Sequence, residues 1–326
     1  YEKDGIPALV TSVLAGKVRT AETATEVVRT LCLLSYQFDR TMALLDSQVV
    51  LALLVLYRNG HITPVSAEMM CILIRNCSTR EECREPLIKQ GAILLMRGLQ
   101  RPLVDCSIAV ARSIIIAADM FARDEGNHDA MVEHGIVHMM YDIVHPKFRN
   151  RIISDKKFPI RADQSYSKFQ HDDAYEKLCM KHPKLSFSLS SLDLERLSKT
   201  CFNLSRSPSV HMSLVQGSIT TWVKVFLSGP IEDNARGNIA SAMCNISATR
   251  SARQPLVDMG SNELLLDLCK DTELMSTKSQ CQIALGNLSD ITHLGAGAVS
   301  SLLELTVVKE DENQTVNADG GCDAYS

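Results

Sequence analysis

Apolar side chains recur at intervals of three and four residues along most of the chain, which is the spacing of one face of an α-helix. The pattern also repeats at longer range, because three C-terminal segments superpose when each is shifted by the distance from Leu197 to Ile239. The rows that coincide are Leu197, Ile239 and Cys281; Thr200, Ala242 and Ala284; Cys201, Met243 and Leu285; and Leu204, Ile246 and Leu288. We therefore predict helices that bury equivalent faces, with small residues allowing close approach between neighbours.

The tripeptide Asn-x-Ser marks the end of each of these segments. Asn203, Asn245 and Asn287 are each followed two residues later by serine, and they are evenly spaced at that same period. Asn76 opens a similar Asn-Cys-Ser. Asn-x-Ser is also an N-glycosylation acceptor, but sugar acceptors have no reason to keep a fixed period, whereas structural repeats do. We interpret the asparagines as positions in a repeat.

A second marker is a glycine placed directly before an apolar segment. It occurs at Gly5, Gly91, Gly135, Gly217, Gly260 and Gly297, and Ser47 occupies the equivalent place in one unit. The markers are regularly spaced, except that the step from Gly135 to Gly217 is nearly twice as long as the others and so holds extra sequence. Glycine suits a sharp turn that needs a positive φ. Each unit is predicted to have a short helix before the glycine, a second helix after it and a longer third helix that carries the asparagine.

These features resemble armadillo repeats, which have three helices in roughly 42 residues, a glycine before the second helix and an Asn-Leu-Ser-like end to the third. The resemblance covers nearly the whole chain and implies an all-α fold, a right-handed α-solenoid of armadillo-type three-helix repeats with one long insertion. It also implies that third helices line a concave groove, where asparagines hydrogen-bond the backbone of an extended peptide. The residues that match those asparagines are Asn76, Asn203, Asn245 and Asn287.

Two further polar rows accompany the asparagines at the same period. Arg196, Asn238 and Gln280 form one row, and Lys199 and Ser241 belong to the other. These rows predict a polar ladder that runs along the stack. The predicted partner-binding residues are Asn76, Arg196, Lys199, Asn203, Asn238, Ser241, Asn245, Gln280 and Asn287.

Several positions depart from the family pattern. Leu33–Leu34 and Ala117–Ala118 stand where two third helices would carry the asparagine motif, so we expect a continuous polar groove only toward the C-terminal end. Nuclear-import adaptors of this family carry a tryptophan four residues before the asparagine, and the sole tryptophan here, Trp222, falls on a second helix. A basic localisation signal is therefore not the expected ligand. The positions that match the tryptophan are Ile72, Lys199, Ser241 and Ile283.

Residues 145–190 interrupt the period between the second and third helices of one repeat. This insertion holds ten Lys or Arg, five Asp or Glu and six aromatic residues. It either docks on an acidic surface, such as an acidic protein tail, RNA or tubulin, or forms a solvated loop pinned by its aromatics. We predict a solenoid over 1–306 and a polar tail over 307–326. The candidate docking residues are Lys147, Arg149, Arg151, Lys156, Lys157 and Arg161.

Composition narrows the functional class. The 11 cysteines lie within apolar helical patterns, which is typical of buried thiols, so we expect a reducing compartment, the cytoplasm, including its cytoskeleton or a cilium. The sequence has no apolar run long enough to span a membrane, so we expect no membrane partner. The net charge of −4 is not that of a general nucleic-acid binder, which makes nucleic acid an unlikely partner for the chain as a whole. His134 and His138 are separated by a glycine between two helices, and Cys179 and His182 lack the paired spacing of a zinc site. We expect no catalytic residue, metal or cofactor.

Two functions are consistent with these patterns. The first is a non-enzymatic protein–protein interaction scaffold that binds an extended partner along the concave groove. The alternative is a structural subunit of a large cytoskeletal or axonemal assembly that docks through the basic insertion. An enzyme would need a cluster of titratable groups beneath the insertion. The expected partner is a protein in either of the first two cases.

Overall fold

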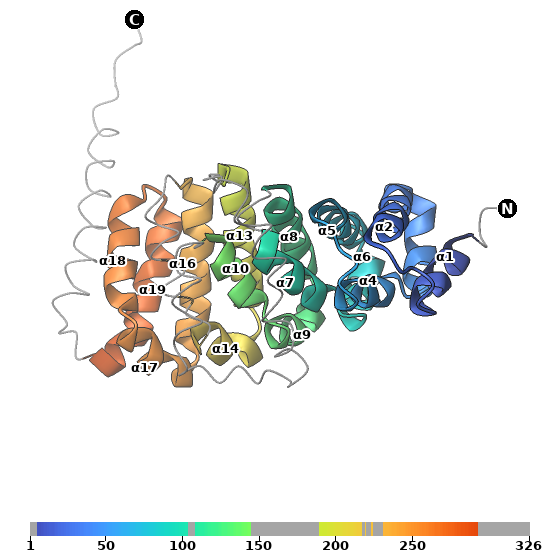
Figure 1. The fold of residues 1–326 in the computed structure, drawn as a ribbon. Helices are drawn as coiled ribbons and strands as arrows, with labels where there is room; N and C mark the ends of the chain where they lie inside the picture. Colours follow the sequence, from blue (N-terminus) through green and yellow to red (C-terminus); the bar gives the residue numbers. More distant parts are fainter. Residues whose placement is uncertain are drawn as a thin grey trace, which may run out of the picture.

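The structure is a computed structural model that describes residues 5–103, 108–144, 189–216, 219, 223 and 231–292. Within these ranges, all regular elements are α-helices or short 3-10 helices. The helices stack in chain order into an elongated array, with α1 near one end and α18 and α19 at the other (Figure 1). The prediction of an all-α solenoid of three-helix repeats is confirmed.

The described helices group into six successive units. The first unit contains a second helix, α1 (Gly5–Leu14), and a third helix, α2 (Ala21–Ser35). The later first helices are η1 (Phe38–Arg40) with α3 (Thr41–Asp46), α6 (Glu81–Lys89), η2 (Glu125–Asn127) with α9 (His128–Glu133), η4 (Pro208–Val210) with α14 (His211–Gln216), and α17 (Arg250–Asp258). The later second helices are α4 (Val49–Arg58), α7 (Ala92–Leu103), α10 (Ile136–Val144) and α18 (Ser261–Asp271). The later third helices are α5 (Pro64–Ser78), α8 (Ile108–Phe121), α13 (Ser191–Leu204), α16 (Asp233–Ala248) and α19 (Met275–Thr292).

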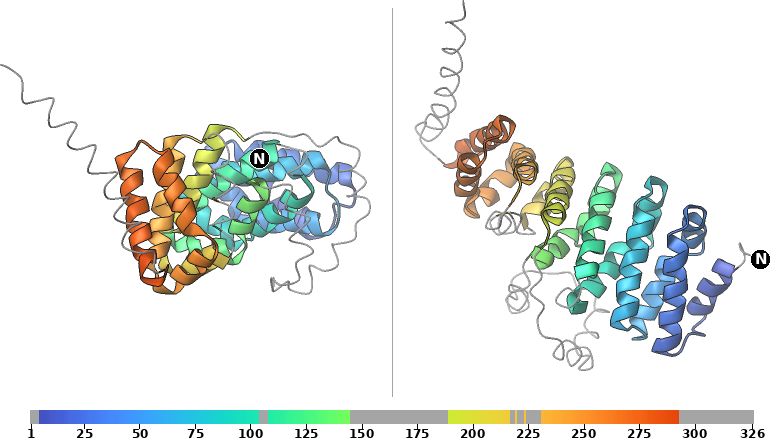
Figure 2. Two further views of the ribbon diagram at one scale, coloured as in Figure 1. Left: turned by 90° about the vertical axis from the view of Figure 1, so that its left-hand side faces the viewer. Right: turned by 90° about the horizontal axis from the view of Figure 1, so that it is seen from above.

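The third helices form one continuous row, in which α2, α5, α8, α13, α16 and α19 each pack against the next. Figure 2 shows the successive units side by side in sequence order. A residue on one third helix therefore lies beside its equivalent one repeat away, and periodic residues form lines across the row. We call the exposed and half-buried side chains of this row the third-helix face.

Left-handed residues connect first helices to second helices. Gly91, Gly135 and Gly260 have φ values of +93°, +89° and +77°, as predicted from their place before an apolar segment. In the unit without a glycine, the prediction of Ser47 is wrong by one residue, because Gln48 has the positive φ of +62°. Ser47 instead ends α3, where its hydroxyl donates to the backbone oxygen of Ala43 at 2.7 Å. The left-handed conformation costs a non-glycine residue roughly 1 kcal/mol.

Side-chain caps fix where several third helices begin. Thr20 caps α2 by accepting a hydrogen bond from the backbone N–H of Thr23. Thr63 and Ser190 open α5 and α13 with capping boxes. In each box, the cap side chain accepts from the backbone N–H three residues later, and the cap's own backbone N–H donates to the side chain at that position. Ser190 is therefore the cap of α13, although the sequence placed it in the insertion.

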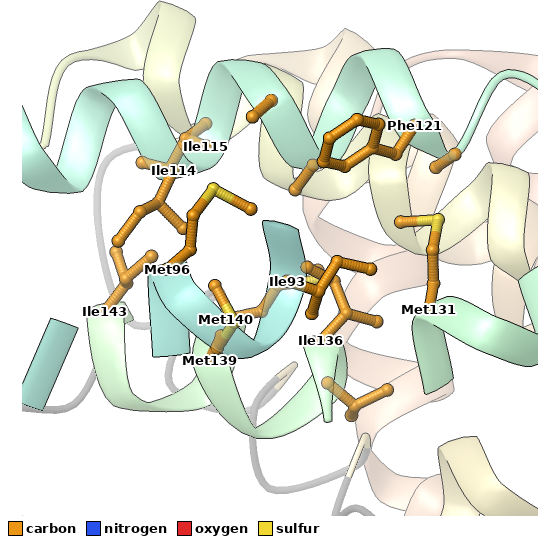
Figure 3. Packing of buried hydrophobic residues seen from close by; sticks show 14 of the residues in the cluster. Ile93, Met96, Ile114, Ile115, Phe121, Met131, Ile136, Met139, Met140 and Ile143 are labelled. Atoms are coloured by element: carbon orange, nitrogen blue, oxygen red, sulfur yellow. The ribbon is translucent and has the colours of Figure 1, made fainter. Parts of the chain in front are cut away.

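Apolar side chains from neighbouring helices fill the interior of the described units. In Figure 3, Ile114, Ile115 and Phe121 of α8 face residues of α7, α9 and α10. Phe121 is fully buried and is among the largest side chains of the core. Burying a large apolar side chain contributes about 1.5–3 kcal/mol, so these layers are the main source of stability. The other labelled side chains are Ile93, Met96, Met131, Ile136, Met139, Met140 and Ile143.

In the part of the chain that the structure describes, no single helix has both the length and the apolar character needed to cross a membrane. Phe38–Asp46 and Val49–Arg58 meet that requirement only together, as a pair bent by 64°. Five residues of the second of these helices are buried in the protein core.

Candidate functional site

The predicted asparagines link neighbouring third helices through serine hydroxyls. The side-chain Nδ2 of Asn76 donates to Ser35 Oγ of the preceding third helix at 3.0 Å. Asn245 donates in the same way to Ser205, at 3.1 Å. Asn287 repeats the contact with Ser247, also at 3.1 Å. Ser205 and Ser247, which follow Asn203 and Asn245 in the sequence, thus accept a hydrogen bond from the asparagine of the next repeat.

Each serine of these contacts uses its own proton within its own helix. Ser205 Oγ donates to the backbone oxygen of Phe202 at 2.7 Å, and Ser247 Oγ donates to that of Cys244 at 2.9 Å. Since a hydroxyl can donate one bond and accept others, the serine oxygen is available to the asparagine. Asn238 makes a fourth contact of this kind, to Ser198 Oγ at 3.1 Å, two helical turns before the Asn245 contact. We call these four contacts the Asn–Ser ladder.

The ladder uses only part of each side-chain amide. An asparagine has two N–H donors and a carbonyl oxygen, and the ladder takes one donor. In Asn76, the oxygen also accepts bonds from the adjacent Arg75, at 3.0 and 3.3 Å. Asn245 and Asn287, both half-buried, keep their second N–H and their oxygen without a partner among the described residues. These groups can therefore bond to a ligand without breaking the ladder.

Asn203 is the exception, because the preceding third helix has no serine at the equivalent position. Two buried histidines establish the alignment: His128 Nε2 donates to the backbone oxygen of Ala122, and His211 Nε2 donates to that of Ser205. Ala122 is therefore the equivalent of Ser205. The same alignment places Met120, and not Ala117–Ala118 as the sequence suggested, at the asparagine position of α8.

The Asn203 side chain makes no hydrogen bond with any described residue. The residue is 7% exposed. Its polar atoms are nevertheless absent from those that are sealed from solvent without a partner. The carbon atoms are thus packed while the amide reaches the surface of the third-helix face.

Lys199 and Arg196 lie on the same side of α13 as Asn203, because residues three and four apart are neighbours on a helix. Lys199 is exposed and Arg196 is half-buried. Neither side chain makes an ion pair or hydrogen bond with the residues that the structure describes. On the next helices, Ser241 and Gln280 are also half-buried at their predicted places. At the positions predicted to bind a partner, the third-helix face is therefore polar from α13 to α19. The same helices also expose three apolar side chains, Leu192 of α13 and Met275 and Ile283 of α19.

At the N-terminal repeats the face exposes large apolar side chains beside polar ones such as Arg29, Arg75 and Asn76. Leu33 occupies the asparagine position of α2 and is 63% exposed, and Val65 of α5 is 51% exposed. Met69, Ile72, Ile116 and Met120 of α5 and α8 are half-buried. Apolar side chains thus interrupt the row of asparagines at α2 and α8, the two third helices whose sequences lack the asparagine motif.

An ion pair joins α8 to α13 at the other end of these helices. Arg112 Nε donates to Asp193 Oδ2 at 3.1 Å. Burial alone would raise the pKa of Asp193, but hydrogen bonds from Ser190 and Arg112 outweigh burial and lower this pKa below its ordinary value. Asp193 therefore stays charged and holds Arg112 in place.

The described cysteines are free thiols, and all but Cys244 are buried. Burial raises the pKa of Cys71 and Cys201 to about 12, which leaves them protonated and unreactive at neutral pH. Across the described residues, no group of three or more His, Cys, Asp or Glu side chains could hold a metal ion.

Some predictions fall on residues outside those described. These include residues 145–188 of the insertion, the tail 307–326, and the positions of Trp222, Gly217 and Gly297. Docking through the insertion stays a prediction. The docking residues concerned are Lys147, Arg149, Arg151, Lys156, Lys157 and Arg161.

No protein-family model and no curated protein matches the sequence. Solved structures do resemble it. The designed armadillo repeat protein YIII(Dq)4CqI is 14% identical, with 87% of this chain and 99% of that chain covered and a TM-score of 0.54. A structure of computationally designed armadillo repeat proteins for modular peptide recognition is 14% identical, with 86% and 99% covered and a TM-score of 0.56. The designed protein YIII(Dq.V1)4CPAF, in complex with peptide (KR)4, is 13% identical, with 87% and 99% covered and a TM-score of 0.54. The chain therefore has an armadillo-like repeat fold.

Proposed function

We propose that this protein is a non-enzymatic scaffold that binds an extended peptide along the third-helix face. The observation that carries the proposal is the Asn–Ser ladder, which holds asparagine side chains in place while leaving part of each amide available. Asn245 and Asn287 each offer one donor and one acceptor, which is what a peptide unit of an extended backbone needs.

The spacing of the repeat suits this partner. Packed helices are about 9 Å apart, and an extended chain advances about 3.3 Å per residue, so about three peptide residues pass each repeat. An asparagine that a neighbouring serine already holds loses little side-chain entropy on binding, which favours affinity. Of the similar designed proteins, one is in complex with a peptide and others are for modular peptide recognition, which supports the same use of this fold.

The test is a selection of peptides from a random twelve-residue display library, followed by fluorescence anisotropy with a selected peptide. Asn245→Ala with Asn287→Ala removes the peptide contacts of two side chains, each worth about 1 kcal/mol net, so we expect roughly thirtyfold weaker binding. The matched control is Asn59→Ala, at the exposed end of α4 and away from the third-helix face. The control should bind as the native protein does.

A circular-dichroism melt of each variant separates binding from folding. The proposal predicts that the double variant still folds, with a modest loss of stability. It is overturned if the double variant binds normally, or if no peptide is selected by the folded protein.

A further inference from the structure

We propose that the bound peptide carries an acidic side chain over α13, with bulky apolar side chains on the part that crosses α5 and α8. This inference rests on the proposed function and specifies the chemistry of its ligand. It is carried by the cluster of Arg196, Lys199 and Asn203, which we call the α13 cluster.

The two cations of the α13 cluster lack partners where comparable cations have them. Lys199 is exposed, Arg196 is half-buried, and neither is neutralised by a described residue. Three other arginines of the third helices are paired with carboxylates, whereas Arg75 bonds to the amide oxygen of Asn76. These pairs are Arg29 with Glu26 at 2.8 Å, Arg112 with Asp193 at 3.1 Å and Arg236 with Asp233 at 3.1 Å. The middle of the face therefore carries positive charge that no described residue neutralises.

Asn203 adds hydrogen-bond donors to that charge. Its side chain is almost entirely buried, yet its amide has no partner among the described residues, because Ala122 replaces the serine of the ladder. Because this amide reaches the surface of the third-helix face, it can bond to a ligand without breaking a contact within the protein. A carboxylate accepts bonds from an amide N–H, an ammonium group and a guanidinium group at once, and charge-assisted bonds of this kind are the strongest. The three side chains of the cluster therefore match an Asp or Glu side chain.

The apolar side chains lie on the N-terminal side of the cluster. Ile116 and Met120 of α8 and Met69 and Ile72 of α5 are half-buried on the third-helix face. Alternate side chains of an extended peptide point the same way, so apolar residues at alternate positions would cover this surface. On the other side of the cluster, Asn245 and Asn287 favour backbone contacts over any particular side chain.

The same charge disfavours a basic peptide. A Lys or Arg side chain placed over Arg196 and Lys199 meets like charge that no described carboxylate pairs with. The peptide (KR)4, which is bound by one structurally similar designed protein, is therefore a useful negative probe for this one.

The experiment measures peptide affinity by fluorescence anisotropy at low and high salt. The probes are an acidic peptide selected from the twelve-residue library, the same peptide with Gln in place of its Asp or Glu, and (KR)4. The protein variants are Lys199→Gln, alone and with Arg196→Gln. Lys17→Gln is the matched control, because Lys17 is exposed in the loop after α1.

We expect the selected peptides to share an acidic residue beside alternating apolar residues, and the double variant to bind roughly tenfold more weakly. The variants should bind the Gln peptide as the native protein does, and affinity for the acidic peptide should fall with salt. Lys199→Gln alone, at an exposed position, keeps the test valid if the double variant is unstable.

The outcomes separate the two proposals. If (KR)4 or the Gln peptide binds as tightly as the acidic peptide, while Asn245→Ala with Asn287→Ala still weakens binding, the acidic ligand is wrong and the peptide-binding function stands. If the variant Lys199→Gln with Arg196→Gln binds the acidic peptide as the native protein does, the acidic ligand is likewise wrong and the peptide-binding function stands. Selection of no peptide at all overturns both proposals.

Discussion

The interface between α13 and α16 and the interface between α8 and α13 join the same kind of helices in different ways. The first contains two contacts of the Asn–Ser ladder, from Asn238 to Ser198 and from Asn245 to Ser205. The second has Ala122 where the ladder needs serine, so Asn203 is left without a partner among the described residues. A single missing hydroxyl thus converts an asparagine that joins two repeats into one that is available to a ligand.

A histidine makes an equivalent hydrogen bond at each of the two interfaces. His128 Nδ1 hydrogen-bonds Ser207 Oγ at 2.6 Å, and His211 Nδ1 hydrogen-bonds Thr249 Oγ1 at 2.7 Å, each reaching into the following repeat. Both histidines also donate to a backbone oxygen at the end of their preceding third helix. Stacking therefore depends on apolar packing and on these histidines, whereas the ladder can be interrupted where a ligand site requires it.

The largest expected effect is the loss of apolar packing beside the interrupted interface. Phe121→Ala removes a fully buried side chain of α8 and should lower the free energy of unfolding by about 3–5 kcal/mol. Urea denaturation followed by circular dichroism measures the change. Leu204→Ala, at the equivalent buried position of α13, should cost about 2–5 kcal/mol. A loss below about 1 kcal/mol for Phe121→Ala would show that packing does not hold this interface.

The shared histidine contact should matter equally at both interfaces. His128→Leu and His211→Leu each leave a buried backbone oxygen without its donor, so we expect each to cost about 2 kcal/mol. Urea denaturation of the two variants compares them directly. Costs that differ by more than about 1 kcal/mol would contradict the view that the interfaces differ only in the ladder.

The ladder should contribute to stability at one interface and not at the other. Asn245→Ala removes a contact and should cost about 1 kcal/mol, whereas Asn203→Ala should change stability by no more than about 0.5 kcal/mol. A double-mutant cycle of Asn245→Ala with Ser205→Ala should give a coupling of at least about 0.5 kcal/mol. Equal costs for the two asparagines would remove the distinction drawn between the interfaces.

The smallest expected effect restores the missing contact. Ala122→Ser places a hydroxyl where other third helices have serine, so Asn203 gains a partner and the protein should gain about 0.5 kcal/mol. The gain should disappear in the Asn203→Ala background. Because the restored contact uses an Asn203 donor, acidic-peptide affinity should also fall modestly. A gain that persists without Asn203 would have another origin.

The sequence predicted the fold well because the repeat is periodic: equivalent residues recur at a nearly constant spacing and bury equivalent faces. Its errors lie where markers are replaced. Gln48 takes the left-handed conformation without being glycine. Met120 occupies the asparagine position of α8, and α8 could be aligned with α13 only through the contacts of His128 and His211.

The ladder was missed although its signal is present in the sequence. An Asn-x-Ser contains both kinds of group, but Ser205 and Ser247 pair with the asparagine of the following repeat, and only the three-dimensional stacking of third helices brings them together. The sequence also shows alanine at position 122, but the consequence for Asn203 can be inferred only once the pairing of asparagine with the serine of the preceding repeat is known.

The most direct measurement is a nuclear magnetic resonance titration of protein labelled with ¹⁵N at asparagine, using a peptide selected from the library. The side-chain amide signals of Asn203, Asn245 and Asn287 are assigned by single substitution, and Asn59 serves as reference. The account predicts that these three signals shift together as the peptide binds, while the Asn59 signal stays unchanged. Saturable peptide binding that leaves the three signals in place would contradict it, because the peptide would then occupy another surface.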